Sequence, residues 1–175
     1  TLKRDVELAR LMGATLHDIA DERFFFSTTL LTHRVVKRAA QRLHPEFNWV
    51  DEPNGVEGTA SGGFRQCEPE IRRMYQRTAL EYPTYLINGG SAQEIAEFMY
   101  CCLPSGQCLV VRDSCSALRI RTLAAIAGVR VKVRCTGSSV FTISEDSTRN
   151  AGVVVVSVKE QPNVPVHVYD FTVPG

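Results

Sequence analysis

The strongest constraint on the fold is a change in hydrophobic periodicity after Pro104 and Gly106. Before this point, apolar residues recur at the three- and four-residue spacing of helices, as Leu8, Leu11 and Met12 do. Beyond it, short runs rich in Val, Phe, Thr and Tyr are separated by turn residues, as in strands. Helices that precede strands favour an α+β fold with a mainly antiparallel sheet over a doubly wound parallel sheet.

The individual elements are predicted from these patterns and from the residues that break them. The first 45 residues are predicted to be helical, with Ser27 or Thr28 as the cap of a helix that Pro45 ends. Residues 48–66 hold many Gly, Asn and Pro and predict a long loop. Further helices are expected over 68–80, after Ser91 and over 116–127, and strands over 108–111, 129–134, 140–144, 153–158 and 166–171.

Length and composition predict one globular domain. The 175 residues can bury a sufficient core. We expect a helical part (1–47), a long loop (48–66) and a core (68–175), with no internal repeat. The net charge of +1 gives no overall electrostatic attraction for nucleic acid or an anionic membrane, so neither is expected as a partner. No apolar run reaches the ~18 residues that a membrane span needs.

The cysteines and the glycine-rich motifs point away from a bound cofactor. The even number of cysteines, six, permits disulfides, but a chain of this length is expected to keep buried free thiols in a reducing compartment. There is no C-x-x-C pair and no histidine close to a cysteine in the sequence, so a zinc site is not expected. There is also no P-loop and no G-x-G-x-x-G motif, so the predicted cofactor set is none.

The turn Gly89-Gly90-Ser91, which follows Asn88, is the segment best suited to chemistry. Two glycines let the backbone approach a ligand closely. At the helix start that follows, free N–H groups and the helix dipole stabilise a thiolate or an oxyanion. Ser91 and Glu94 also match the S-x-x-E capping box, so a plain helix cap is the alternative interpretation of the same residues.

Residues 88–96 resemble the nucleophile helix of papain-like cysteine enzymes, in particular the deamidase and protease domains of secreted bacterial toxins and effectors. The resemblance implies a papain-like fold, a Cys-His-Asp triad, a protein substrate in a host cell, and secretion by a bacterium into the reducing host cytoplasm. The residues that it implies are Ser91, His167 and Asp170 as catalytic residues, and Asn88, Gly89, Gly90 and Gln93 as the oxyanion turn.

The sequence departs from this family at the nucleophile, where a serine replaces the cysteine. This indicates either a Cys-to-Ser inactive form or a natural pseudoenzyme. In a regular strand, His167 and Asp170 lie on opposite faces, so they are alternatives more readily than partners. If Asp170 is the acid, the family's pattern places the general base at residue 139. That residue is Ser139, which cannot act as a base. If His167 is the base, its acid is Asp146, Asp113 or a residue after position 175.

The function expected from this resemblance is a monomeric, thiol-dependent amidohydrolase, either a glutamine deamidase or a cysteine protease, that acts on a host protein. The first alternative is a catalytically dead papain-like module that only binds its partner. The second is a mono-ADP-ribosyltransferase effector, which residues 131–134 and 138–140 resemble faintly.

Overall fold

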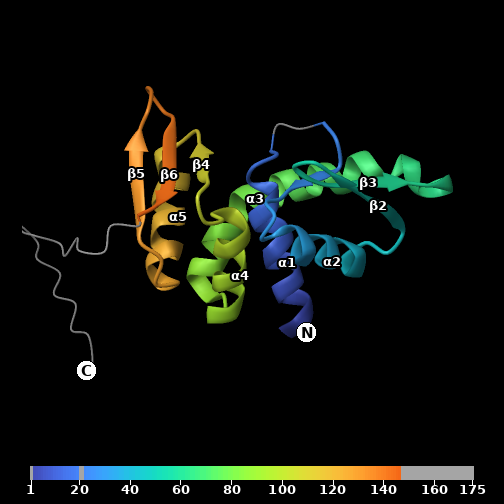
Figure 1. Cartoon of the computed structure of the whole chain (residues 1–175), viewed down its shortest axis with the longest axis horizontal. Helices are drawn as coiled ribbons and strands as arrows, with labels where there is room; N and C mark the ends of the chain where they lie inside the picture. The colour runs from blue at the N-terminus through green and yellow to red at the C-terminus, as the bar shows by residue number, and fades with distance from the viewer. Residues whose placement is uncertain (1, 20–21, 147–175) are drawn as a thin grey trace, which may run out of the picture.

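The chain passes twice through the same order of elements: helix, strand, helix and two strands (Figure 1). The computed structural model describes residues 2–19 and 22–146. The first round consists of α1 (Leu2–Thr15), β1 (Phe25–Ser27), α2 (His33–Leu43), β2 (Phe47–Glu52) and β3 (Gly55–Ala60). A 3-10 turn (Gly62–Gln66) and the long helix α3 (Glu68–Gly89) follow. The second round consists of α4 (Ala92–Cys102), β4 (Cys108–Val111), α5 (Ser114–Ile126), β5 (Val131–Cys135) and β6 (Phe141–Glu145).

The two rounds also build the same kind of sheet. The strand order is β1-β3-β2 in one sheet and β4-β6-β5 in the other, and all four pairings are antiparallel. In each sheet the last strand of the round therefore lies between the first and the second. This repeat of topology was not expected from the sequence, because the two rounds share an order of elements but little residue pattern.

Helices α1 and α4, which open the two rounds, lie side by side at the centre of the molecule, between the two sheets (Figure 1). Gly13 of α1 allows this approach. A Cβ atom at residue 13 would lie 2.5 Å from the carbonyl oxygen of Phe98 and 3.0 Å from the backbone nitrogen of Cys102, both in α4. The absence of a side chain at this position is therefore a packing requirement.

A continuous apolar core joins both rounds. It includes Phe26, Met12, Phe98 and Ile143, which come from both sheets and from both central helices. The α+β class with antiparallel sheets is as predicted. Within the described ranges, no helix combines the length and the apolarity that crossing a membrane requires.

Two predictions for the first 66 residues are corrected by the structure. A strand, β1, lies within the segment predicted to be helical, because Phe24 and Phe26 turn their rings into an aromatic cluster with Trp49. The predicted loop of residues 48–66 contains the hairpin β2–β3. Its Gly and Asn residues suggested a loop, but Trp49 of β2 packs over Gly58 of β3, where a side chain would clash.

Helix α3 is longer than predicted. The sequence indicated a helix that ends near residue 80 and an extended segment before the glycine turn, because of Pro83. The structure continues the helix through Pro83 to Gly89. Proline removes one backbone hydrogen bond, but burial of Tyr82, Pro83 and Leu86 against the core compensates for this loss. The predictions for α4, β4, α5, β5 and β6 are confirmed to within a few residues, and those for 153–158 and 166–171 lie outside the described residues.

Candidate functional site

The predicted nucleophile position, Ser91, is the N-cap of α4. Its hydroxyl accepts a hydrogen bond from the Glu94 backbone N–H (3.2 Å) and donates to Glu94 Oε2 (2.8 Å). The Ser91 backbone N–H donates to the same carboxylate oxygen (2.9 Å). This is a complete capping box between Ser91 and Glu94 Oε2, whereas the buried Glu94 Oε1 has no hydrogen-bond partner in the described structure.

The remaining residues of the predicted catalytic site do not assemble around Ser91 in the described structure. Asn88 and Gly89 are the last residues of α3, Gly90 caps it, and Gln93 is an exposed residue of α4. The other two catalytic predictions, His167 and Asp170, lie outside the described residues. None of the described histidines makes a hydrogen bond with Ser91.

One hydrogen-bonded chain of polar side chains was missed by the sequence analysis. Thr28 Oγ1 lies 3.0 Å from His33 Nδ1, and His33 Nε2 lies 2.9 Å from Asp51 Oδ1, beside a cleft of about 430 Å³. Lys37 Nζ lies 2.6 Å from the same Asp51 oxygen. The hydrogen bonds from Lys37 and then His33 lower the pKa of Asp51. These hydrogen bonds connect the loop before α2 to the end of β2 and hold the two segments together.

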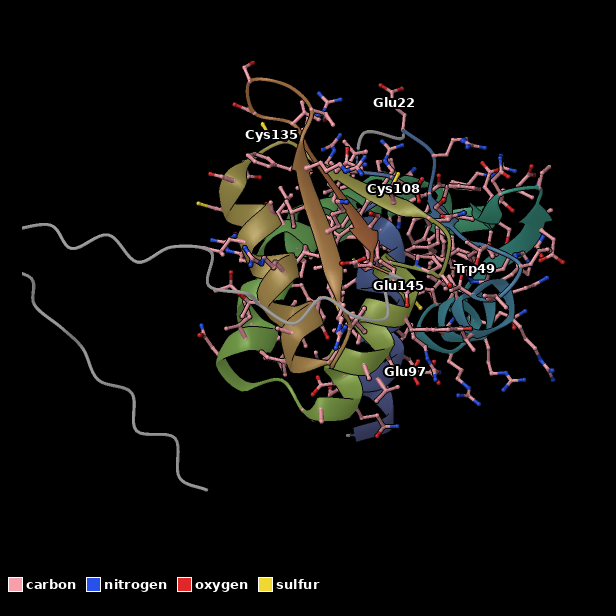
Figure 2. The ribbon with its side chains drawn as sticks, turned by 60° about the vertical axis from the view of Figure 1, so that its left-hand side comes forward. Glu22, Trp49, Glu97, Cys108, Cys135 and Glu145 are labelled. Atoms are coloured by element: carbon pink, nitrogen blue, oxygen red, sulfur yellow. The ribbon has the colours of Figure 1, made fainter. Side chains whose placement is uncertain are left out.

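The sheet β4-β6-β5 has one face against helix α5 and one open face (Figure 2, where Cys108, Cys135 and Glu145 mark its three strands). The register aligns Leu109, Ile143 and Val133 on the inner face, and all three belong to the core or pack against it. The next row, on the open face, aligns Val110, Thr142 and Arg134. The side chains on the open face of this sheet are Cys108, Val110, Lys132, Arg134, Thr142 and Ser144.

The charged side chains that the three strands place on this open face are both cationic, and the acid Asp146 follows one residue past β6, where its backbone N–H bonds to the carbonyl oxygen of Arg130. Lys132 and Arg134 are exposed, and neither forms an ion pair within the described structure. Arg112 is exposed just past the end of β4. The three strands carry no carboxylate on this face, because Glu145 is in register with Val131 on the inner side. The face therefore combines unpaired cations with hydroxyl groups, an arrangement suited to a polyanion. The signal in the sequence was the alternation Val-Lys-Val-Arg of residues 131–134.

The similarity of this chain to known proteins lies in its structure. The sequence matches no family model and no curated protein. A solved structure of the homing endonuclease I-DmoI, in complex with its target DNA and in the presence of manganese, is similar at a TM-score of 0.50 and 12% identity. The match covers 82% of this chain and 88% of that chain. A mesophilic variant of I-DmoI matches at a TM-score of 0.50 and 11% identity, with 82% and 90% of the two chains covered.

The described residues do not fit a divalent metal such as the manganese present with I-DmoI in the first of these structures. Among residues 2–19 and 22–146, no group of three or more His, Cys, Asp or Glu side chains could hold a metal ion.

The papain-like interpretation is wrong, because the two solved structures described above, which share this fold, are of the homing endonuclease I-DmoI. Three predictions that depended on it are wrong for the same reason: a thiol hydrolase, a toxin-type deamidase or protease, and a Cys-to-Ser form. The pseudoenzyme and ADP-ribosyltransferase alternatives find no support in this fold. The exclusion of nucleic acid as a partner is also corrected, because I-DmoI was solved in complex with its target DNA. At these identities the likeness shows one thing about this chain: it has the fold of the homing endonuclease I-DmoI.

Proposed function

We propose that this protein binds double-stranded DNA through the open face of the sheet β4-β6-β5. The observation that carries the proposal is the basic character of that face. Lys132 and Arg134 project from adjacent positions of one side of β5, and neither has a carboxylate partner within the described structure. Lys and Arg side chains on one face of a sheet can neutralise phosphates and release the counterions bound to them.

The uncharged groups of the same face support this proposal. Thr142 and Ser144 lie on the central strand β6, in register with Arg134 and Lys132. Their hydroxyl groups can donate hydrogen bonds to phosphate oxygens or reach base edges. Within this sheet, β5 and β6 form an antiparallel two-stranded ribbon, an element that fits the major groove of B-DNA, which is about 12 Å wide. The solved structures of I-DmoI with target DNA are a precedent for DNA binding by this fold.

The near-zero net charge of the chain does not contradict DNA binding. The total of +1 sums twenty cationic and nineteen anionic residues without regard to their position. Many of these charges neutralise one another locally; Arg10, for example, contacts both Glu97 and Glu7. The potential that a phosphate experiences depends on the unpaired charges nearest to it, because surface charges more than about 8 Å away are largely screened at physiological salt.

The test is a titration of a fluorescently labelled DNA duplex with the full chain, followed by anisotropy at several salt concentrations. The double variant Lys132→Ala/Arg134→Ala should weaken binding and lower the salt-dependence slope by about 1.8, or about 0.9 for each lost phosphate contact. The matched control is Arg73→Ala/Arg77→Ala, which removes two exposed arginines of α3 and the same charge. No binding by the wild type, or equal losses in the two double variants, would overturn the proposal.

A further inference from the structure

The two sheets occupy equivalent places in the fold, but their open faces carry different charges. The open side of β2 and β3 presents polar and acidic residues, with Val50 of β2 opposite Glu57 of β3 and Glu52 at the end of the hairpin. The equivalent side of the second sheet presents Lys132 and Arg134 instead. The two rounds therefore share a topology but differ in the charge of their open sheet faces.

The cation Arg23, beside the first open face, already has partners. Arg23, which precedes β1, lies 4.0 Å from Glu57 Oε2, and its guanidinium carbon stands 4.5 Å from the centre of the Phe25 ring. Asp51 of β2 is in register with buried Val56, so it lies on the opposite side of the sheet, where it holds Lys37 of α2. On the open face, Arg23 is thus paired with Glu57, whereas Glu52 has no ion pair within the described residues.

We propose that only one of the two sheets contacts DNA: the open face of the second sheet (β4-β6-β5) binds the duplex, and the open face of the first sheet (β1-β3-β2) does not contact the phosphates. This inference rests on the function proposed above and goes beyond it, because it assigns the whole phosphate interface to one of two topologically equivalent sheets. The physical reason is repulsion. An unpaired carboxylate such as that of Glu52 opposes binding when it is brought against a phosphate backbone, and Arg23 cannot offset it without leaving Glu57.

The experiment removes acidic charge from the first open face and asks whether bound DNA responds. The variant Glu52→Gln/Glu57→Gln is compared with Glu70→Gln/Glu81→Gln, which removes two exposed acids of α3. Both variants raise the net charge by the same amount. If the first face lies off the DNA, the two variants should have the same affinity to within about twofold, which reflects only the shared change in net charge. Circular dichroism confirms that each variant is folded.

The outcomes separate the inference from the function on which it rests. If the wild type binds no duplex, the proposed function fails and this inference fails with it. If the wild type binds and Glu52→Gln/Glu57→Gln tightens binding about tenfold more than the α3 control, the first face touches DNA and the one-sided arrangement is overturned. Equal affinities of the two variants, together with a loss in Lys132→Ala/Arg134→Ala, support it.

Discussion

At the scale of single residues, connected ion pairs join α1 to α2 and α4. Glu7 is almost fully buried in α1 and is held by Arg10 and by Arg42 of α2. Arg10 also reaches Glu97 of α4, with Nε to Oε2 at 2.8 Å, and these two carboxylates raise its pKa. The buried carboxylate is acceptable because cations from two helices, Arg10 of α1 and Arg42 of α2, satisfy it; without both of them the buried charge would be unpaired.

His17 gives the residue-scale prediction, which concerns pH. Its Nε2–H donates to the Cys102 carbonyl oxygen at 2.7 Å, and burial lowers its pKa below the ordinary value of 6.5. The unfolded chain therefore binds a proton at a higher pH than the folded chain does. The contribution of neutral His17 to the free energy of unfolding should be fully present above pH 6.5 and should decrease as the pH falls below that value.

The measurement is urea unfolding of the wild type and of His17→Gln at several pH values. Carboxylates titrate in both proteins, so the difference between the two free energies isolates His17. We expect this difference to decrease from pH 7.5 to pH 5.5, values chosen at about one pH unit on either side of the ordinary histidine pKa. A difference that stays constant over this interval would contradict the prediction.

At the scale of elements, the molecule is organised by the close packing of α1 on α4. The ion pair Arg10–Glu97 joins residues that are 87 positions apart, and the same shift relates Thr15 and Cys102, the last residues of the two helices. The two helices are thus equivalent members of the repeat and meet at equivalent positions. Their separation at the crossing is limited by backbone atoms, since Gly13 faces the carbonyl oxygen of Phe98.

Gly13→Ala tests this packing. Alanine favours a helix over glycine by about 1 kcal/mol, which would stabilise α1 in isolation. Here the added methyl group would lie 2.5 Å from a backbone oxygen, so the helices must separate. We expect a net loss of about 1–3 kcal/mol in the free energy of unfolding. Gly89→Ala at the end of α3 is the control, because no atom lies within 4 Å of its added Cβ. Equal stabilities of the two variants would rule out the close approach.

At the scale of the whole molecule, two topologically equivalent rounds share one core and divide the surface charge unequally. Buried side chains from α1, α4 and both sheets form one contiguous apolar cluster. Because α1 packs against α4, neither round covers its central helix without the other. Stability is therefore shared between the rounds, whereas the open sheet faces are free to differ, since open-face residues are not constrained by packing.

The shared core predicts that the molecule unfolds in one step. Trp49 is the only tryptophan and lies buried in the first round, so its fluorescence reports on that round. Far-ultraviolet circular dichroism reports on the helices of both. We expect the two signals to give coincident urea transitions, because loss of one round would expose the core face of the other. A fluorescence transition that clearly precedes the circular dichroism transition would show that the rounds unfold independently.

The sequence by itself determined the local features of this protein. Helical periodicity, the Ser91–Glu94 cap and the alternation of residues 131–134 are set by neighbours within a few positions, and they appear in the structure as α4 and β5. Only the tertiary structure decided which strands pair, that α1 meets α4, and that Gly89-Gly90-Ser91 is a junction between two helices. Strand order and helix contact depend on residues that are far apart in the chain, and a net charge of +1 contains no information about position. The basic face could therefore be recognised only after the register had placed Lys132 and Arg134 on one side of a sheet.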